Sequence, residues 1–175
     1  MKKIGRITAV FLAASLFVLA GCGKGGDTAP ASGSEVQIKG AGGYVFLSKD
    51  VTVEIDAEAE PILTALGEPQ STYEAPSCAF GDLDKVWTYP GYRIDTYQIG
   101  GVDYISDVIF TDDSVKTPEG LCIGNTVEDM KKVYGEPESI DSAQAVYLSG
   151  DMKLVFLLDG DVIKTIEYLN RQLES

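Results

Sequence analysis

The chain has 175 residues, a formal net charge of −13 and no histidine. An acidic chain repels nucleic acid and anionic lipid headgroups, so we expect no nucleic-acid partner. The missing histidine removes the most common general base and metal ligand, and it excludes Ser-His-Asp and Cys-His catalysis. The sequence contains no Gly-rich phosphate loop, Cys-x-x-Cys pair or zinc-type spacing, and we expect no cofactor and no metal site.

The first residues are typical of a secretory signal peptide, which we place at residues 1–21. Three basic residues among the first six precede an uncharged run over residues 7–20, and small residues follow. As a helix this run rises about 1.5 Å per residue, which falls short of the roughly 30 Å that a spanning helix must cross. We therefore predict export without a transmembrane anchor.

The segment Leu19-Ala20-Gly21-Cys22 resembles the lipobox of bacterial lipoproteins. The resemblance implies that the Cys22 thiol receives a diacylglycerol and becomes the N-terminus after cleavage. The alternative is an ordinary cysteine near a standard cleavage site. Removal of the leader lowers the number of basic residues from 14 to 11 against 27 acidic ones, which gives a net charge of −16. Because this charge does not favour binding to anionic lipids, we expect the lipid on Cys22 to anchor the protein to the outer face of the bacterial membrane.

Residues 22–43 are rich in Gly, Ser and Ala and lack apolar periodicity, as in a flexible tether. Residues 44–175 have the length of one ordinary domain. Within this domain a short phrase occurs twice, as Gly67-Glu68-Pro69 and Gly135-Glu136-Pro137, at an offset of 68 residues. Glycine tolerates the left-handed conformation at a helix C-terminus and proline cannot continue a helix, so each phrase predicts a helix end.

The second helix has a predicted start as well as an end. Asn125 or Thr126 can cap its N-terminus, and acidic residues fill its first turn. Its expected apolar face is made of residues at i, i+3, i+6 and i+7, namely Val127, Met130, Val133 and Tyr134.

Runs typical of β-strands, divided by Gly and Asp turns, follow each helix. We predict an α+β fold of two tandem helix-then-β-meander repeats, at about 51–113 and 120–170, with three strands each. The repeats would share one antiparallel sheet with the short helices packed on one face. The alternative is that the two helix ends coincide by chance. A separate hairpin is expected in "YVFLSKDVTVEI", before the first helix.

The pattern of Ile-Gly-Asn-Thr, a short helix, Tyr-Gly-Glu-Pro and antiparallel strands resembles the tandem repeats of the β-lactamase-inhibitor-protein fold. It is also similar to the small lipoprotein subunit of the outer-membrane β-barrel assembly machinery. Phrases such as "SCAFGDLDKVWTYPGYRIDTY" resemble uncharacterised lipoproteins of Gram-positive anaerobes. These resemblances imply a fold over most of residues 51–168, and they carry no activity or site residues to this chain.

Acidic pairs are the remaining candidates for catalysis or for calcium binding. The pairs at 82 and 84, 112 and 113, and 159 and 161 lie in expected turns, where Asp bonds to the local backbone. None follows the Asp-x-Asp-x-Asp-Gly calcium loop. We therefore favour a turn role over glycosidase-type chemistry.

Cys78 and Cys122 form an even pair in an exported chain, and we predict a disulfide between them. Two buried thiols are the alternative.

Trp87, Tyr89, Tyr92, Arg93 and Tyr97 cluster on two neighbouring strand candidates and are the predicted binding residues. Aromatic side chains of this kind suit a recognition surface, and they equally suit the edge of a core.

Together these features predict a membrane-tethered extracytoplasmic lipoprotein. We expect it to act as a non-enzymatic protein-binding or envelope-assembly module for an envelope or extracellular protein. The alternative is an envelope enzyme or solute-binding protein with a carboxylate-lined groove.

Overall fold

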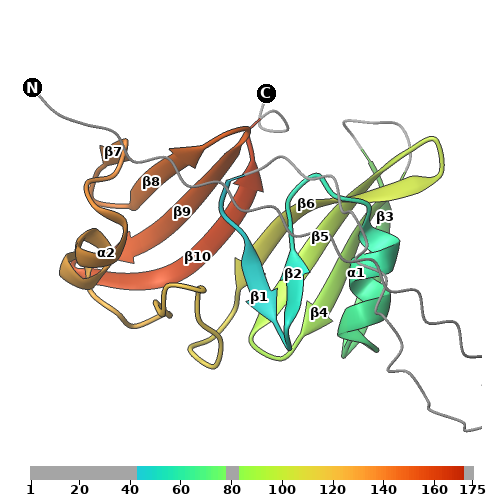
Figure 1. Ribbon diagram of the computed structural model, residues 1–175, viewed down its shortest axis with the longest axis horizontal. Coiled ribbons are helices and arrows are strands. Elements are labelled where there is room, and N and C mark those ends of the chain that lie inside the picture. The colour runs from blue at the N-terminus through green and yellow to red at the C-terminus, as the bar shows by residue number, and fades with distance from the viewer. Residues whose placement is uncertain (1–42, 78–82, 172–175) are drawn as a thin grey trace, which may run out of the picture. The chain divides into compact units, whose positions relative to one another are not determined.

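The computed structural model describes residues 43–77 and 83–171, and within them strands dominate (Figure 1). Strand makes up 51% and helix 13% of this part. The elements in chain order are β1 (Phe46–Ser48), β2 (Val51–Val53), α1 (Ala59–Leu66), β3 (Ser71–Pro76), β4 (Leu83–Tyr89), β5 (Tyr92–Ile99), β6 (Val102–Phe110), α2 (Val127–Tyr134), β7 (Ser139–Ile140), β8 (Gln144–Ser149), β9 (Met152–Asp159) and β10 (Val162–Asn170).

Eight strands form one antiparallel sheet in the order β3-β4-β5-β6-β10-β9-β8-β7. Neighbours along the chain pair with one another within β3–β6 and within β7–β10. The two groups join where β10 pairs with β6, in the register Glu167 to Ile109. The short strands β1 and β2 pair separately as the expected hairpin. β3 and β7 are the two edges of the large sheet.

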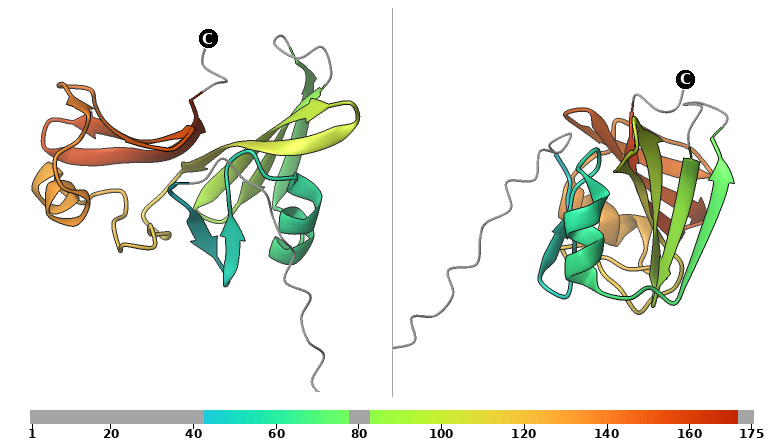
Figure 2. Two further views of the ribbon diagram at one scale, coloured as in Figure 1. Left: turned by 45° about the horizontal axis from the view of Figure 1, so that its top comes forward. Right: turned by 90° about the vertical axis from the view of Figure 1, so that its right-hand side faces the viewer.

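Figure 2 shows α1, α2 and the β1–β2 hairpin on the same side of the large sheet. Their buried side chains, which include Phe46, Ile62 and Met130, join one core with the strand residues that face them. Ile94, Val108 and Phe156 are among the strand residues in that core and are at most about 1% exposed, because alternation along each strand sends every second side chain to the covered face. The opposite face carries no helix among the described residues.

The predicted α+β fold class is wrong, since the described chain is mostly β with two eight-residue helices. Four strands, not three, follow each helix. The prediction missed β3 because its sequence, Ser71–Pro76, is almost wholly exposed and has no apolar alternation. It missed β7 because that strand is only two residues long. Both strands are held by pairing with a neighbour and not by local propensity.

Both helices end where the repeated phrase predicts. Gly67 follows α1 and Gly135 follows α2, and each glycine donates its backbone N–H to a carbonyl four residues earlier. On α2, Thr126 is the N-cap and forms a reciprocal capping box with Asp129. Val133 was expected on the apolar face but is 41% exposed.

The predicted signal peptide (1–21) and tether (22–43) lie outside the described residues, apart from residue 43. Among the helices that the structure does describe, neither is long and apolar enough to cross a membrane.

Candidate functional site

A cavity of about 490 Å³ opens between α1, β4 and the start of β6. A volume of this size is typical of ligand sites in proteins. The residues that line it are Glu58, Glu60, Leu63, Thr64, Trp87, Gly101, Val102 and Asp103. They come from three places in the chain, namely α1 with its N-cap residue, the middle of β4, and the β5–β6 turn with the first two residues of β6.

Backbone pairing between the segment before α1 and β6 brings two of these places together. The N–H of Asp56 donates to the carbonyl of Ile105 at 2.7 Å, and the N–H of Ile105 donates to the carbonyl of Ala57 at 2.9 Å. Glu58 then forms an isolated bridge with Tyr104. This short ladder places Glu58 beside the end of β6 that carries Asp103.

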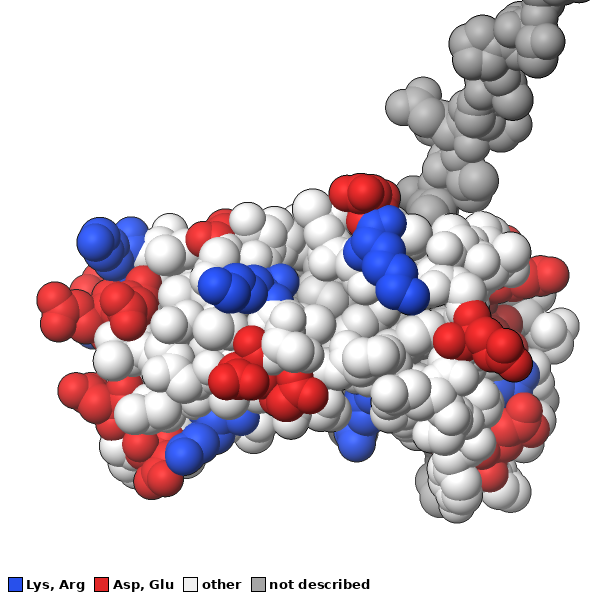
Figure 3. Space-filling model, turned by 90° about the horizontal axis from the view of Figure 1, so that it is seen from below, with Lys and Arg blue, Asp and Glu red and all other residues white. Residues whose placement is uncertain are grey.

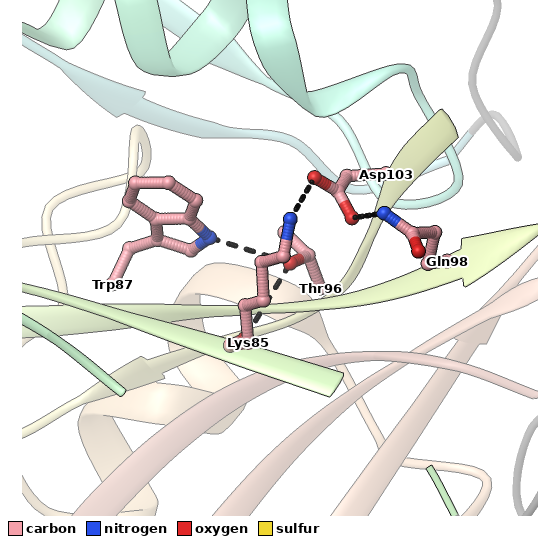
Figure 4. A network of polar contacts seen from close by, with 5 residues as sticks. All are labelled: Lys85, Trp87, Thr96, Gln98 and Asp103. Atoms are coloured by element: carbon pink, nitrogen blue, oxygen red, sulfur yellow. Dashed lines mark hydrogen bonds and ion pairs between the residues drawn. The ribbon is translucent and has the colours of Figure 1, made fainter. Parts of the chain in front are cut away.

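A network of polar contacts fixes the wall of the cavity (Figure 4). The indole N–H of Trp87 donates to Thr96 Oγ1 at 3.3 Å, and Thr96 is itself 2% exposed. Lys85 Nζ lies 2.7 Å from Asp103 Oδ2, and Gln98 Nε2 donates to Asp103 Oδ1 at 3.1 Å. The network orients the Trp87 ring and engages both oxygens of Asp103.

The other two acidic side chains of the cavity belong to Glu58 and Glu60, which are exposed residues. Glu58 is the N-cap residue of α1, yet its side chain makes no capping hydrogen bond. The cavity therefore combines an aromatic wall, apolar side chains from Leu63 and Val102, and carboxylates. Such a lining can hold a ligand that has both an apolar stem and a positive charge.

Of the five predicted binding residues, only Trp87 lines this cavity. The three tyrosines among them are buried, as the alternative of a core edge expects, and they form no exposed recognition surface. Tyr89 and Tyr92 are each 2% exposed and Tyr97 is 7% exposed. Their hydroxyl groups are used internally: Tyr89 donates to the Gly67 carbonyl, Tyr92 to Ser48, and Tyr97 to the Asp56 carboxylate.

Arg93 lies on the opposite sheet face from Trp87, because Trp87 pairs with Ile94 and alternation turns Arg93 away. The structure does not bring the two residues together. Arg93 Nε lies 3.2 Å from Asp95 Oδ1, and the Arg93 side chain is 42% exposed.

Three carboxylates surround Arg93 on this uncovered face, from β5, β6 and β10. The pKa of Asp107 is raised to about 6, mainly by burial and also by the nearby charges of Asp95 and Glu167, while a hydrogen bond with Ser106 and the charge of Arg93 oppose the shift. Burial is also the main reason why the pKa values of Asp95 and Glu167 are raised. This cluster is separate from the cavity.

The acidic pairs lie only partly in turns. Asp84 is a paired residue of β4 and Asp159 is the last residue of β9, so the turn prediction is wrong for these two, whereas Asp112 follows the end of β6. Asp112 Oδ1 accepts a hydrogen bond from the Ser114 backbone N–H at 2.8 Å, and these bonds with Ser114 lower its pKa. Asp159 forms an exposed ion pair with Lys164 at 3.6 Å. Asp82 lies outside the described residues. Within residues 43–77 and 83–171, no group of acidic or cysteine side chains is arranged to hold a metal ion.

Two of the three cysteines, Cys22 and Cys78, lie outside the described residues, so the lipidation and the disulfide stay predictions. Cys122 has no disulfide partner within the described part of the chain. Its backbone N–H donates to Asn125 Oδ1 at 2.8 Å, which gives Asn125 a local role next to the helix cap.

The sequence pointed to Trp87 but missed Glu58, Glu60 and Asp103. Glu58 and Asp103 lie 45 positions apart in the sequence. They come close only because the segment before α1, residues 56–58 (the α1 approach), pairs with β6, and such a distant pairing leaves no local pattern in the sequence. No protein-family model, curated protein or solved structure matches the chain.

Proposed function

We propose that the chain is a non-enzymatic binding module, held on the outer face of a bacterial membrane by a lipid on Cys22, that engages an envelope or extracellular protein. The observation that carries this proposal is the cavity at Trp87. Its tryptophan is half-buried and held by a hydrogen bond, so that binding a partner costs little additional side-chain ordering. Half-buried Trp residues of this kind are common binding anchors.

The choice of binding over catalysis rests on the chemistry of the lining. General acid–base work needs a group free to exchange a proton with the substrate. Asp103 is held by Lys85 and Gln98 on both oxygens, and the chain contains no histidine. Glu58 and Glu60 are exposed carboxylates, but no serine, cysteine or lysine is among the described lining residues to act as a nucleophile with them. The cavity is therefore better suited to holding a ligand than to reacting with one.

A solute-binding role is the second candidate, and one observation favours it. Three carboxylates line a cavity large enough for a small molecule. In that case the occupant would be a free solute and not a side chain of a partner protein.

Affinity capture of the tagged full-length chain from cross-linked membranes tests the proposal. We expect Trp87→Leu to lose the specifically captured protein without loss of folding, as judged by thermal melting. Tyr73→Leu is the matched control, because Tyr73 is an aromatic residue of the same sheet that is 67% exposed and lies outside the cavity. Equal capture by both variants would contradict the proposal, as would a Trp87 variant that is unfolded.

A further inference from the structure

We propose that the Trp87 cavity recognises a positively charged ammonium or guanidinium group at the end of an aliphatic stem. This inference rests on the proposed binding function and names the chemistry of the ligand. The group can belong to a lysine or arginine side chain of a partner protein or to a free polyamine.

Charge is the first reason. Three of the eight lining residues, Glu58, Glu60 and Asp103, are acidic, and none of the described lining residues is basic. Lys85 neutralises only Asp103. The N-terminal end of α1 adds about half a positive charge, which is smaller than the two charges of the glutamates. An excess of negative charge is left at the cavity.

On the side of the molecule seen in Figure 3, acidic and basic residues are interspersed, with no large field of one sign. The chain as a whole is acidic, so the experiment has to separate contact with the carboxylates of the cavity from general attraction of a cation to the protein. Carboxylates that remain solvated give individually modest ion pairs, which are weakened by salt.

The apolar part of the lining is the second reason. Trp87 contributes an aromatic ring, and Leu63 and Val102 contribute aliphatic side chains. Lysine and arginine bury their methylene stems against such surfaces while the charged head stays close to polar groups. A cation near an indole ring gains further attraction from the ring electrons.

Trp87 is the only tryptophan of the chain, so its fluorescence reports directly on the cavity. The full chain in detergent is titrated with spermidine, Nα-acetyl-lysine amide and Nα-acetyl-arginine amide. Nα,Nε-diacetyl-lysine amide is the neutral control. We expect a saturable change in emission with the cationic probes alone, weakened about fivefold between 20 mM and 500 mM salt.

Substitutions locate the effect. We expect Glu60→Gln to weaken binding about two- to fivefold, and Glu58→Gln with Glu60→Gln to weaken it about tenfold. Glu128→Gln is the matched control, since Glu128 occupies the first turn of α2 and does not line the cavity. Binding of spermidine and of the amino-acid amides supports a shared cation site, and their relative affinities separate a free polyamine from a partner side chain.

Equal binding of the neutral probe would overturn the inference, and so would Glu60→Gln binding as tightly as Glu128→Gln. If no cationic probe changes the emission while capture of a partner still depends on Trp87, the ligand class is wrong and the binding function stands. If both are lost, both proposals fail.

Discussion

Each of the two helix-ending glycines has a backbone conformation that other residues avoid. Gly67 has φ 82° and ψ −166°, and Gly135 has φ 80° and ψ −158°. Their φ is positive as expected, but the extended ψ differs from the left-handed helical value and belongs to a region that glycine alone populates readily. The glycine in the repeated phrase is therefore required by the backbone itself.

Alanine at either position should destabilise the fold through strain. A Cβ built on Gly67 or Gly135 meets no atom within 4 Å, so steric contact adds nothing to the cost. We expect Gly67→Ala and Gly135→Ala each to lower the free energy of unfolding by about 1–3 kcal/mol in denaturant titrations. Glu68→Ala, at the exposed neighbouring position, should stay within about 0.5 kcal/mol of the wild type. A smaller loss at the glycines than at Glu68 would contradict this account.

The backbone carbonyl of each of these glycines accepts a hydrogen bond from a tyrosine hydroxyl of the sheet. Tyr89 of β4 donates to the Gly67 carbonyl at 3.2 Å, and Tyr147 of β8 donates to the Gly135 carbonyl at 2.8 Å. Both tyrosines are buried. The phrase thus ends a helix and also presents a carbonyl to the core.

Removal of either hydroxyl leaves the carbonyl without this bond. We expect Tyr89→Phe and Tyr147→Phe each to cost about 1 kcal/mol of stability, since a typical internal hydrogen bond contributes that much. Tyr73→Phe serves as the control, because Tyr73 is 67% exposed. Chemical denaturation measures all three, and a Tyr89 or Tyr147 variant as stable as the Tyr73 variant would show that these bonds contribute nothing.

Asp107 should make stability fall as pH rises. Its pKa is about 6 in the folded chain against an ordinary 3.8, so between these values the folded state binds more protons than the unfolded state. The stabilising contribution is complete below pH 3.8 and is lost as pH rises through 6.

The neutral substitution Asp107→Asn should therefore stabilise the protein at pH 8, by at most about 3 kcal/mol, and the gain should shrink toward pH 4. Asp84→Asn, an exposed position on the same face, is the control. Unfolding free energies measured at pH 4, 6 and 8 check the trend. A gain for Asp107→Asn that is independent of pH would contradict the burial argument.

At the scale of elements, the two helices begin differently. Thr126 accepts from the Asp129 N–H at 3.1 Å and the Asp129 carboxylate accepts from the Thr126 N–H at 3.1 Å. The α1 N-cap, Glu58, makes no such bond, and α1 is instead held by burial of Ala59, Ile62 and Leu66. α2 buries only Met130 fully, so it depends more on its cap.

Thr126→Ala should consequently destabilise the chain by about 1 kcal/mol, in the usual range for a lost N-cap. Glu58→Ala removes an N-cap side chain that makes no capping bond and should cost less. Hydrogen exchange at the α2 amides gives a local reading, with protection lost in α2 and kept in α1. Equal effects of the two substitutions on stability would rule out a special role for the capping box.

The sequence predicts an element when neighbouring residues determine it, and fails when contacts with distant parts of the chain determine it. The helix ends and the β1–β2 hairpin follow from local backbone chemistry and were predicted. β3 is held by β4 alone, so its exposed sequence carries no signal. Trp87 and Tyr89 lie on the same face of β4, as alternation predicts. Only Tyr89 is fully buried, where it contacts the end of α1. Which part of a face is covered is a property of the tertiary packing.

At the scale of the whole molecule, two strand pairings determine where the candidate site lies. The β6–β10 pairing joins two groups of four strands into one sheet, and the α1 approach pairs with the other end of β6. The cavity lies beside this second contact. A small shift in the α1 approach would separate Glu58 from Asp103 without breaking the main sheet, so the cavity is positioned by few contacts.

The proposed attachment to the membrane also belongs to this scale, and the proposal assigns it to a lipid on Cys22. If residues 1–21 are removed as predicted, the chain has a net charge of −16, which repels anionic headgroups. Neither of the two described helices is long and apolar enough to cross a membrane. Two acyl chains contribute about 0.8 kcal/mol per buried CH₂, which is enough for stable anchoring. We expect Cys22→Ala in the full chain to leave the membrane fraction or to persist as the unprocessed precursor. Fractionation with intact-mass measurement decides this, Cys78→Ala should stay membrane-bound, and an unchanged mass with full membrane retention of Cys22→Ala would refute lipidation at this residue.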